Sequence, residues 1–211
     1  MNKRKTAFTR IFIATFMVVI TMWRISLAVP KQSTGRMRIA SHYFPLSVGN
    51  SWLYEIRPRP KFAAKTVKWT VTQRETIRGK TVFHLWPTPA QGDEPLSLSR
   101  VEAGIVEEGT ERFLLKNPLL TGGRWTAKSL SLKKPGAVHT FDMVSVGKAC
   151  SVGSHSFDDC AIVRETDEAN NLASVTTYAR GIGPVRYVYF KGLQSGEIET
   201  TLTIESWVLH D

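Results

Sequence analysis

The clearest pattern of apolar and polar positions in the chain is an alternation close to its C-terminal end. Ile198, Leu202, Ile204 and Val208 fall on one set of alternate positions, and Glu, Thr and Ser side chains fill most of the positions around them. Successive side chains of a β-strand point to opposite faces of the sheet, so this pattern predicts a long strand with one face on the core and the other in water. Residues 67–71 alternate in the same way and predict a second strand of this kind.

Short apolar runs with turn residues between them occupy the rest of the chain after residue 41. They predict further strands at residues 52–56, 81–86, 96–102, 105–108, 112–115, 139–146, 161–166, 175–179 and 185–190. Residues 150–160 hold Ser, Gly and Asp, which favour turns, and predict a loop. No helical period extends over about 10–12 residues in this part of the sequence. The pattern predicts an all-β fold with a single antiparallel β domain, either an open or partly closed barrel or, alternatively, a β-sandwich.

One short motif occurs twice in the predicted domain. The two copies are Pro45-Leu46-x-x-Gly49-x-x-Trp52 and Pro118-Leu119-x-x-Gly122-x-x-Trp125. Proline suits the entrance of a strand, and glycine permits the positive φ of a tight turn. Tryptophan then brings a large apolar surface onto the chain that leaves the turn. The repeat therefore predicts two corners, each a turn followed by a tryptophan, that close one β core.

The N-terminal segment has the three-part layout of a secretory signal peptide. Residues 1–10 are basic, Ile11–Trp23 is an apolar run, and small residues precede a cut after Ala28. We predict a signal peptide at residues 1–28, a linker at 29–41 and the antiparallel β domain at 42–211. Export to the periplasm or the extracellular space follows. The alternative is that the segment stays uncleaved as a membrane anchor, which is the one membrane contact we expect. As a helix, however, the apolar run would be only roughly 20 Å long, whereas the hydrocarbon core of a bilayer is about 30 Å thick.

The formal charge of +10 is concentrated at the N-terminus. Without residues 1–28 the chain keeps 23 Lys and Arg against 18 Asp and Glu, a net charge of +5. This mild excess falls short of a nucleic-acid-binding protein, so we expect no nucleic acid partner. Two basic segments, Arg57–Lys61 and Lys128–Lys134, are expected to steer the domain towards an anionic component of the cell envelope.

The two cysteines, Cys150 and Cys160, lie ten positions apart. An even count in an exported protein favours a disulfide. The alternatives are a metal site that adds His155 and either Asp158 or Asp159, and a pair of free thiols. The spacing is not that of a C-x-x-C metal-binding pair, so we expect the disulfide, no metal and no cofactor.

A hydrolase would need a nucleophile, a histidine and a carboxylate. Ser154, His155, Asp158 and Asp159 supply these residue types, but neighbours in sequence rarely form a triad, and no G-x-S-x-G elbow is present. We therefore expect no catalytic residues, with an exported hydrolase as the last of three alternatives.

Four tryptophans of the predicted domain are the candidate ligand-binding residues. Trp52, Trp69, Trp86 and Trp125 would line an apolar groove, as in barrels that hold one small ligand. The alternative is that they only fill the core. The first hypothesis is accordingly a non-enzymatic exported cell-envelope protein that binds an apolar or lipid-like ligand or a partner. The second is a purely structural or assembly module of the envelope.

Three motifs together resemble a known group of proteins. They read Tyr43-Phe44-Pro45-Leu46-x-x-Gly49-x-x-Trp52-x-Tyr54, Phe157-x-x-Cys160-x-x-Val163 and Tyr178-Ala179-x-Gly181-x-Gly183-x-Val185. With the mid-chain Pro118 motif, they resemble a family of uncharacterised exported bacterial β-rich proteins, many of them lipoprotein-like. The resemblance covers residues 43–209 and implies an exported or envelope-attached β domain with no assigned activity. This chain departs from it because no cysteine that could be lipidated follows the apolar run.

Overall fold

The computed structural model describes residues 37–58, 63–89, 95–128, 138–168, 170–194 and 196–210. All of them belong to one unit that extends from Arg36 to Asp211. The predicted signal peptide and most of the predicted linker lie outside the described residues.

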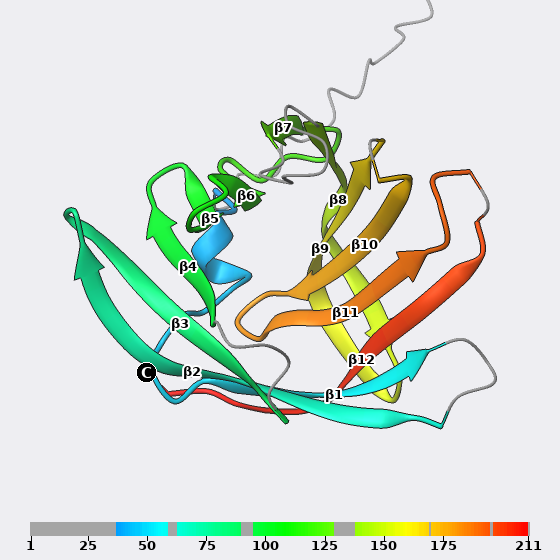
Figure 1. The fold of residues 1–211 in the computed structure, drawn as a ribbon, viewed down its shortest axis with the longest axis horizontal. Coiled ribbons are helices and arrows are strands. Elements are labelled where there is room, and N and C mark those ends of the chain that lie inside the picture. Colours follow the sequence, from blue (N-terminus) through cyan, green and yellow to red (C-terminus); the bar gives the residue numbers. More distant parts are fainter. Residues whose placement is uncertain are drawn as a thin grey trace, which may run out of the picture. The chain divides into compact units, whose positions relative to one another are not determined.

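Twelve strands form a single antiparallel sheet (Figure 1). They are β1 (Ser51–Pro58), β2 (Lys65–Ile77), β3 (Lys80–Thr88), β4 (Leu96–Val101), β5 (Gly104–Glu107), β6 (Arg112–Lys116), β7 (Arg124–Lys128), β8 (Val138–Val152), β9 (His155–Asp167), β10 (Leu172–Ala179), β11 (Gly183–Phe190) and β12 (Ile198–Val208). A short 3-10 helix, η1 (Ala40–His42), precedes them. The sheet order is β6-β5-β4-β3-β2-β1-β12-β11-β10-β9-β8-β7. The predicted antiparallel all-β domain is confirmed, in the form of a nearly closed, barrel-like sheet.

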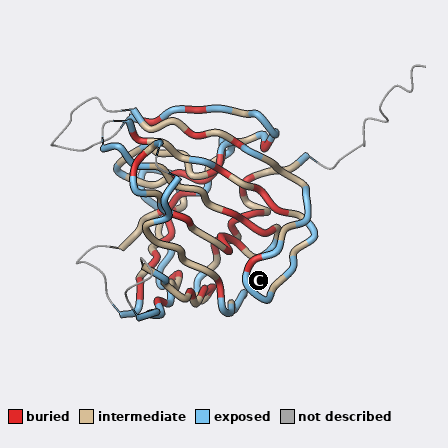
Figure 2. The backbone as a smooth tube through the Cα atoms, turned by 90° about the vertical axis from the view of Figure 1, so that its right-hand side faces the viewer, coloured by how far each residue is buried: buried red, intermediate tan, exposed pale blue. Residues whose placement is uncertain are grey.

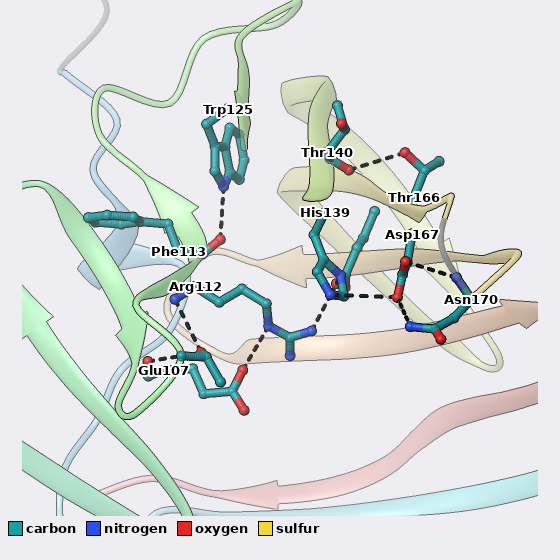
Figure 3. A network of polar contacts seen from close by, with 11 residues as sticks. Glu107, Arg112, Phe113, Trp125, His139, Thr140, Thr166, Asp167 and Asn170 are labelled. Carbon is teal, nitrogen blue, oxygen red and sulfur yellow. Dashed lines mark hydrogen bonds and ion pairs between the residues drawn. The ribbon is translucent and has the colours of Figure 1, made fainter. Parts of the chain in front are cut away.

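The sheet is two runs of six strands joined along β1 and β12. Strands β1 to β6 follow one another outward on one side, and β12 to β7 do so on the other. The two ends of the order, β6 and β7, come near each other but share no backbone ladder. We call this line the seam. At the seam the indole Nε1–H of Trp125 donates to the carbonyl oxygen of Phe113 at 2.8 Å (Figure 3).

The first copy of the repeat forms the corner that leads into β1. The Gly49 N–H donates to the carbonyl oxygen of Val71 at 2.8 Å, and the Val71 N–H donates back to that of Asn50 at 2.8 Å. Gly49 has a φ of +95°, which favours glycine. Trp52 follows on β1 with 1% of its surface exposed.

The second copy forms the same corner in front of β7. The Gly122 N–H donates to the carbonyl oxygen of Met143 at 2.8 Å, and the Met143 N–H donates back to that of Gly123 at 2.8 Å. In both copies the turn thus binds to the next strand of its own run, β2 or β8. In chain order the two runs begin at β1 and at β7. Each of them therefore starts with the same turn and a buried tryptophan, as the repeat predicts.

Strands β8 and β9 extend further than the sequence predicts. Residues 150–160 were predicted as a loop, and this is wrong: the two strands form one long hairpin with its turn at Gly153 and Ser154. Cys150 and Cys160 lie on these neighbouring strands and are joined in a disulfide. The disulfide and the ladder hold the polar residues of this range extended, although their types favour turns. Strand β7, with Trp125 and Ala127 buried, was not predicted.

The last strand contains an irregularity that its sequence pattern hides. Pairing of β12 with β1 is shifted between Leu53 and Tyr54, so that one residue of β12 is passed over. After this β-bulge the two faces of the strand exchange. Ile204 is buried as predicted, but Val208 is 52% exposed and Trp207 packs against the core instead. Figure 2 shows buried and exposed stretches alternating along the strands.

Residues 37–41, predicted as the end of the linker, lie against the sheet. Ala40 is fully buried, and its N–H donates to Asn117 Oδ1 at 2.7 Å. Arg38 forms an ion pair with Asp159 at 3.4 Å. In the part of the chain that the structure describes, no helix has the length and hydropathy needed to cross a membrane.

Candidate ligand-binding site

An apolar cavity of about 220 Å³ lies inside the curved sheet. Aromatic side chains form eight of its eighteen lining residues, with aliphatic side chains such as Leu85, Val163 and Leu202 and a few polar ones among them. The rings belong to Phe44, Trp52, Tyr54, Trp69, Phe141, Tyr178, Tyr187 and Tyr189. We call this cavity the aromatic chamber. Its walls come from both runs of strands, so closure of the sheet creates it.

Two pairs of rings in the chamber pack edge to face. The centroids of Tyr54 and Tyr187 lie 5.8 Å apart with an interplanar angle of 68°, and those of Phe44 and Trp52 lie 5.6 Å apart at 79°. This geometry places the positive edge of one ring on the negative face of the next. The wall is therefore fixed by ring-to-ring contacts.

Three tyrosines of the chamber, Tyr54, Tyr178 and Tyr187, lie in the core or pack against it. Burial raises the pKa of Tyr54, Tyr178 and Tyr187 above the ordinary value of tyrosine. The Tyr54 hydroxyl donates to the carbonyl oxygen of Pro184 at 2.6 Å. All three side chains are thus neutral at physiological pH and add no charge to the chamber.

A second cavity of about 400 Å³, with polar or charged side chains at seven of its eleven lining positions, adjoins the chamber. Both cavities are lined by Arg112, Glu165, Ser174 and Tyr189, which therefore stand at the boundary between them. The second cavity is further lined by His139, Asp167, Glu199 and Thr200 among others. We call it the polar mouth.

Arg112 links the two sides of the seam at this boundary. Its Nε–H donates to Glu107 Oε2 at 2.7 Å on β5, and its Nη1–H donates to Glu165 Oε1 at 2.8 Å on β9. Burial alone would lower the pKa of Arg112, but the charges of Glu165 and Glu107 raise it above its ordinary value. The arginine is therefore a permanent cation held by two carboxylates.

His139 continues the network on β8 (Figure 3). Its Nδ1 lies 2.8 Å from Glu165 Oε1, and its Nε2 lies 3.6 Å from Asp167 Oδ2. Asp167 is 4% exposed and accepts hydrogen bonds from the backbone N–H and the side-chain amide of Asn170, at 3.1 and 2.5 Å. Both ring nitrogens of His139 thus face carboxylates.

The four predicted tryptophans are separated by the fold. Trp52 and Trp69 are cross-strand neighbours on β1 and β2, and both line the chamber. Trp125 lies at the seam, stacked on Phe141 with ring centroids 5.4 Å apart. Trp86 follows Leu85, which lines the chamber, so alternation along β3 places Trp86 on the opposite face.

The residues weighed for hydrolysis or metal binding have other contacts. His155 Nε2 lies 3.2 Å from the carbonyl oxygen of Glu205, and its ring meets Trp207 edge to face. Cys150 and Cys160 are bonded to each other in the disulfide, so neither thiol can bind a metal. Within the described ranges, no group of three or more His, Cys, Asp or Glu side chains is arranged to hold a metal ion.

The two basic segments are only partly described. Arg57 pairs with Glu55 of its own strand at 2.8 Å, and Lys128 is exposed at the end of β7. Residues 59–62 and 129–137 lie outside the described residues, so contact with an anionic envelope component stays a prediction.

Sequence reasoning missed the charged boundary of the site. Arg112 and Glu165 are 53 positions apart, and His139 and Glu165 are 26 apart. Each is a single polar residue in an ordinary strand pattern, and no local motif marks it. Only the pairing order of the sheet brings the three together.

Comparison with known proteins adds little to this geometry. No protein-family model matches the sequence, and no curated protein matches it. One similar solved structure is a presumed exported protein with a YmcC-like fold from Bacteroides fragilis, with 11% identity, a TM-score of 0.46, and 80% of this chain and 99% of that chain covered. Another is a presumed lipoprotein from Parabacteroides distasonis, with 10% identity, a TM-score of 0.42, and 79% and 98% covered. Neither likeness bears on function at this level of similarity.

Proposed function

We propose that this chain is an exported, non-enzymatic protein of the cell envelope that binds one apolar or lipid-like ligand in the aromatic chamber. The observation that carries the proposal is the chamber itself, a largely apolar space within the sheet that shares four lining residues with a second, more polar set of side chains at the mouth. Ligand sites are commonly concave and mostly apolar, with a few polar groups that orient the ligand. The mouths of β-barrels are among the places where such sites occur.

The size of the chamber supports a compact apolar ligand. An apolar cavity of about 150 Å³ stays dry and binds benzene. The chamber, at about 220 Å³, is larger, and fourteen of its eighteen lining residues are aromatic or aliphatic. A ring system or a short hydrocarbon chain fits this space, and a longer molecule would extend into the polar mouth.

One further feature supports the class of protein. The Cys150–Cys160 disulfide is typical of proteins that work in an oxidising compartment, which agrees with the predicted export.

The proposal is tested with the full chain, exported to an oxidising compartment and then stripped of bound lipid. Binding of the neutral apolar dye N-phenylnaphthylamine is followed by its fluorescence. Thr176→Phe places a ring in the chamber and should abolish dye binding. Thr66→Phe makes the same change at an exposed position of β2 and should bind the dye like the wild type.

Two results would overturn the proposal. The first is a wild-type protein that binds no apolar dye, which would favour the structural module. The second is undiminished binding by Thr176→Phe. If that variant fails to fold, Ser174→Phe fills the boundary between chamber and mouth and gives the same comparison.

A further inference from the structure

A third pocket, of about 410 Å³, lies against strands β2, β3 and β4 and shares no lining residue with the aromatic chamber or the polar mouth. Its polar lining consists of Arg74 on β2, Thr81 on β3, Arg100 on β4 and Ser47 in the corner that leads into β1. All four side chains can donate hydrogen bonds. In the described part of the chain no carboxylate lines this pocket, which we call the arginine pocket.

The register of the sheet brings the two arginines together. Arg74 is the cross-strand partner of Phe83, and Phe83 is the partner of Leu98 on β4. Arg100 lies two positions after Leu98 and therefore on the same face. The Cζ atom of Arg100 lies 5.7 Å from the centroid of the Phe83 ring. Two positive charges thus stand over one buried ring.

Neither of these charges is neutralised by an ion pair within the described ranges. Arg100 Nη2–H donates to the carbonyl oxygen of Leu46 at 3.0 Å, and Arg74 has no hydrogen bond or ion pair with a described residue. Partial burial lowers the pKa of Arg100, and the charge of Arg74 lowers it further. In Arg112, by contrast, carboxylates raise the pKa. The charge that acts on Arg100 is therefore a like charge.

The carboxylates of the neighbouring segments do not form ion pairs with the pocket. Glu75 follows Arg74 in the sequence, so alternation along β2 places it on the other face, where its Oε1 lies 2.5 Å from His84 Nε2. Glu102 lines a neighbouring cavity together with Arg100, but it is exposed to water and forms no ion pair with the arginine. The positive charge of the arginine pocket is thus available to a ligand.

We propose that the arginine pocket binds a tetrahedral dianion, phosphate or sulfate, either free or as the head of a small ester. Guanidinium groups suit such oxyanions because their N–H donors form a planar fork that binds two oxygens at once. A dianion would neutralise both arginines and relieve their repulsion. The hydroxyls of Ser47 and Thr81 can donate to its remaining oxygens. The site is separate from the aromatic chamber, so the inference does not depend on the proposed function.

One lining residue bears on the source of the anion. Val48 is 49% exposed and lines the same pocket. The organic part of an ester would cover this side chain, whereas a free anion would leave it in water. A comparison of phenyl phosphate with inorganic phosphate therefore distinguishes the two sources.

The test titrates the full chain with sodium sulfate, sodium phosphate, phenyl phosphate and sodium acetate by isothermal titration calorimetry. All titrations are made at the same mildly alkaline pH and the same low ionic strength, because salt screens exposed charges. We expect sulfate and both phosphates to bind at least about tenfold more tightly than acetate, since a dianion doubles the Coulomb attraction to two arginines. Tighter binding of phenyl phosphate than of phosphate identifies an ester as the ligand, and equal affinities identify the free anion.

Three single substitutions locate the site. Arg74→Gln and Arg100→Gln should each weaken sulfate binding by roughly five- to twentyfold. Arg78→Gln removes the same charge from an exposed position at the turn of the β2–β3 hairpin, outside the pocket, and should bind sulfate like the wild type. Without an anion, Arg74→Gln should unfold at the temperature of the wild type or above it, because the substitution removes a repulsion. This result excludes misfolding as the cause of weaker binding.

Two results would overturn the proposal. The first is a wild-type protein that binds sulfate and phosphate no more tightly than acetate. The second is an equal loss of sulfate affinity in Arg74→Gln and Arg78→Gln, which would show that only the net charge of the protein matters.

Discussion

The indole of Trp52 lies directly against Gly183. A Cβ atom added to Gly183 would lie 2.8 Å from the Trp52 Nε1, closer than side chains tolerate, and the φ of Gly183 is +117°. The indole N–H donates to the carbonyl oxygen of the preceding residue, Ile182, at 2.7 Å. The first copy of the repeat is thus joined to the turn between β10 and β11. Two motifs that are about 130 positions apart in the sequence build one contact at the wall of the chamber.

Replacement of this glycine should be costly. Gly183→Ala combines a positive φ with a clash against a fully buried indole, and we expect it to lower the free energy of unfolding by about 2–4 kcal/mol. Gly181→Ala is the matched control, since Gly181 also has a positive φ, +75°, but a Cβ added there has no other atom within 4 Å apart from its chain neighbours. That variant should lose only about 1 kcal/mol. Urea denaturation of both proteins makes the comparison, and equal losses would show that the contact with Trp52 is unimportant.

The hydrogen bond at the seam gives a second prediction. Trp125→Phe keeps an aromatic ring against Phe141 but removes the donor to the Phe113 carbonyl, so we expect a loss of about 1–2 kcal/mol in unfolding free energy. Trp86→Phe shrinks a half-buried tryptophan outside the core cluster and should cost less than about 1 kcal/mol. Thermal and urea denaturation measure both variants. The prediction is wrong if the Trp86 variant is the less stable of the two.

The side chains of Arg112 and Glu165 should contribute to stability as a coupled pair. A double-mutant cycle with Arg112→Met and Glu165→Gln is expected to give a coupling energy of about 1–2 kcal/mol, because both side chains are largely buried and hydrogen bonded. The exposed pair Arg124–Asp142 is the control. Its cycle should show little or no coupling, since water screens it. Comparable coupling in the two cycles would contradict a special role for the pair at the chamber boundary.

The buried tyrosines predict a dependence of stability on alkaline pH. Burial raises the pKa of Tyr54, Tyr178 and Tyr187 in the folded protein, whereas in the unfolded chain they ionise near the ordinary value of about 10. Between these values the unfolded state releases protons that the folded state keeps. The stabilisation from neutral tyrosines is therefore complete below pH about 10 and is lost as the pH rises, by up to about 1.4 kcal/mol per pH unit for each tyrosine.

This dependence is measured by urea denaturation at a series of alkaline pH values, with tyrosinate absorbance as a direct readout of ionisation. Tyr54→Phe removes one of the titrating groups and should make the fall in stability less steep. A stability that stays level while the pH rises well above 10 in the wild type would refute the prediction.

The amino-acid sequence by itself determined the class of the fold and its local elements. Alternation of apolar and polar residues identified most strands. The doubled motif identified the two corners at Gly49 and Gly122, because glycine permits the positive φ of a tight turn and the tryptophan after it has a large apolar surface to bury. The even count of cysteines in a chain with a predicted export signal favoured the disulfide between Cys150 and Cys160. These are properties of neighbouring residues, and they are readable without knowledge of the strand order.

The tertiary structure alone decided which side chains meet. A single bulge in β12 moved Val208 to the surface and turned Trp207 against the core, in a stretch where Trp207, Val208 and Leu209 are all apolar and the sequence does not say which face is buried. The pairing order of the sheet placed Trp52 and Trp69 in the chamber and Trp86 outside it. It also brought Arg112 to Glu165 across 53 positions, since electrostatic pairing depends on distance in space and leaves no trace in sequence spacing.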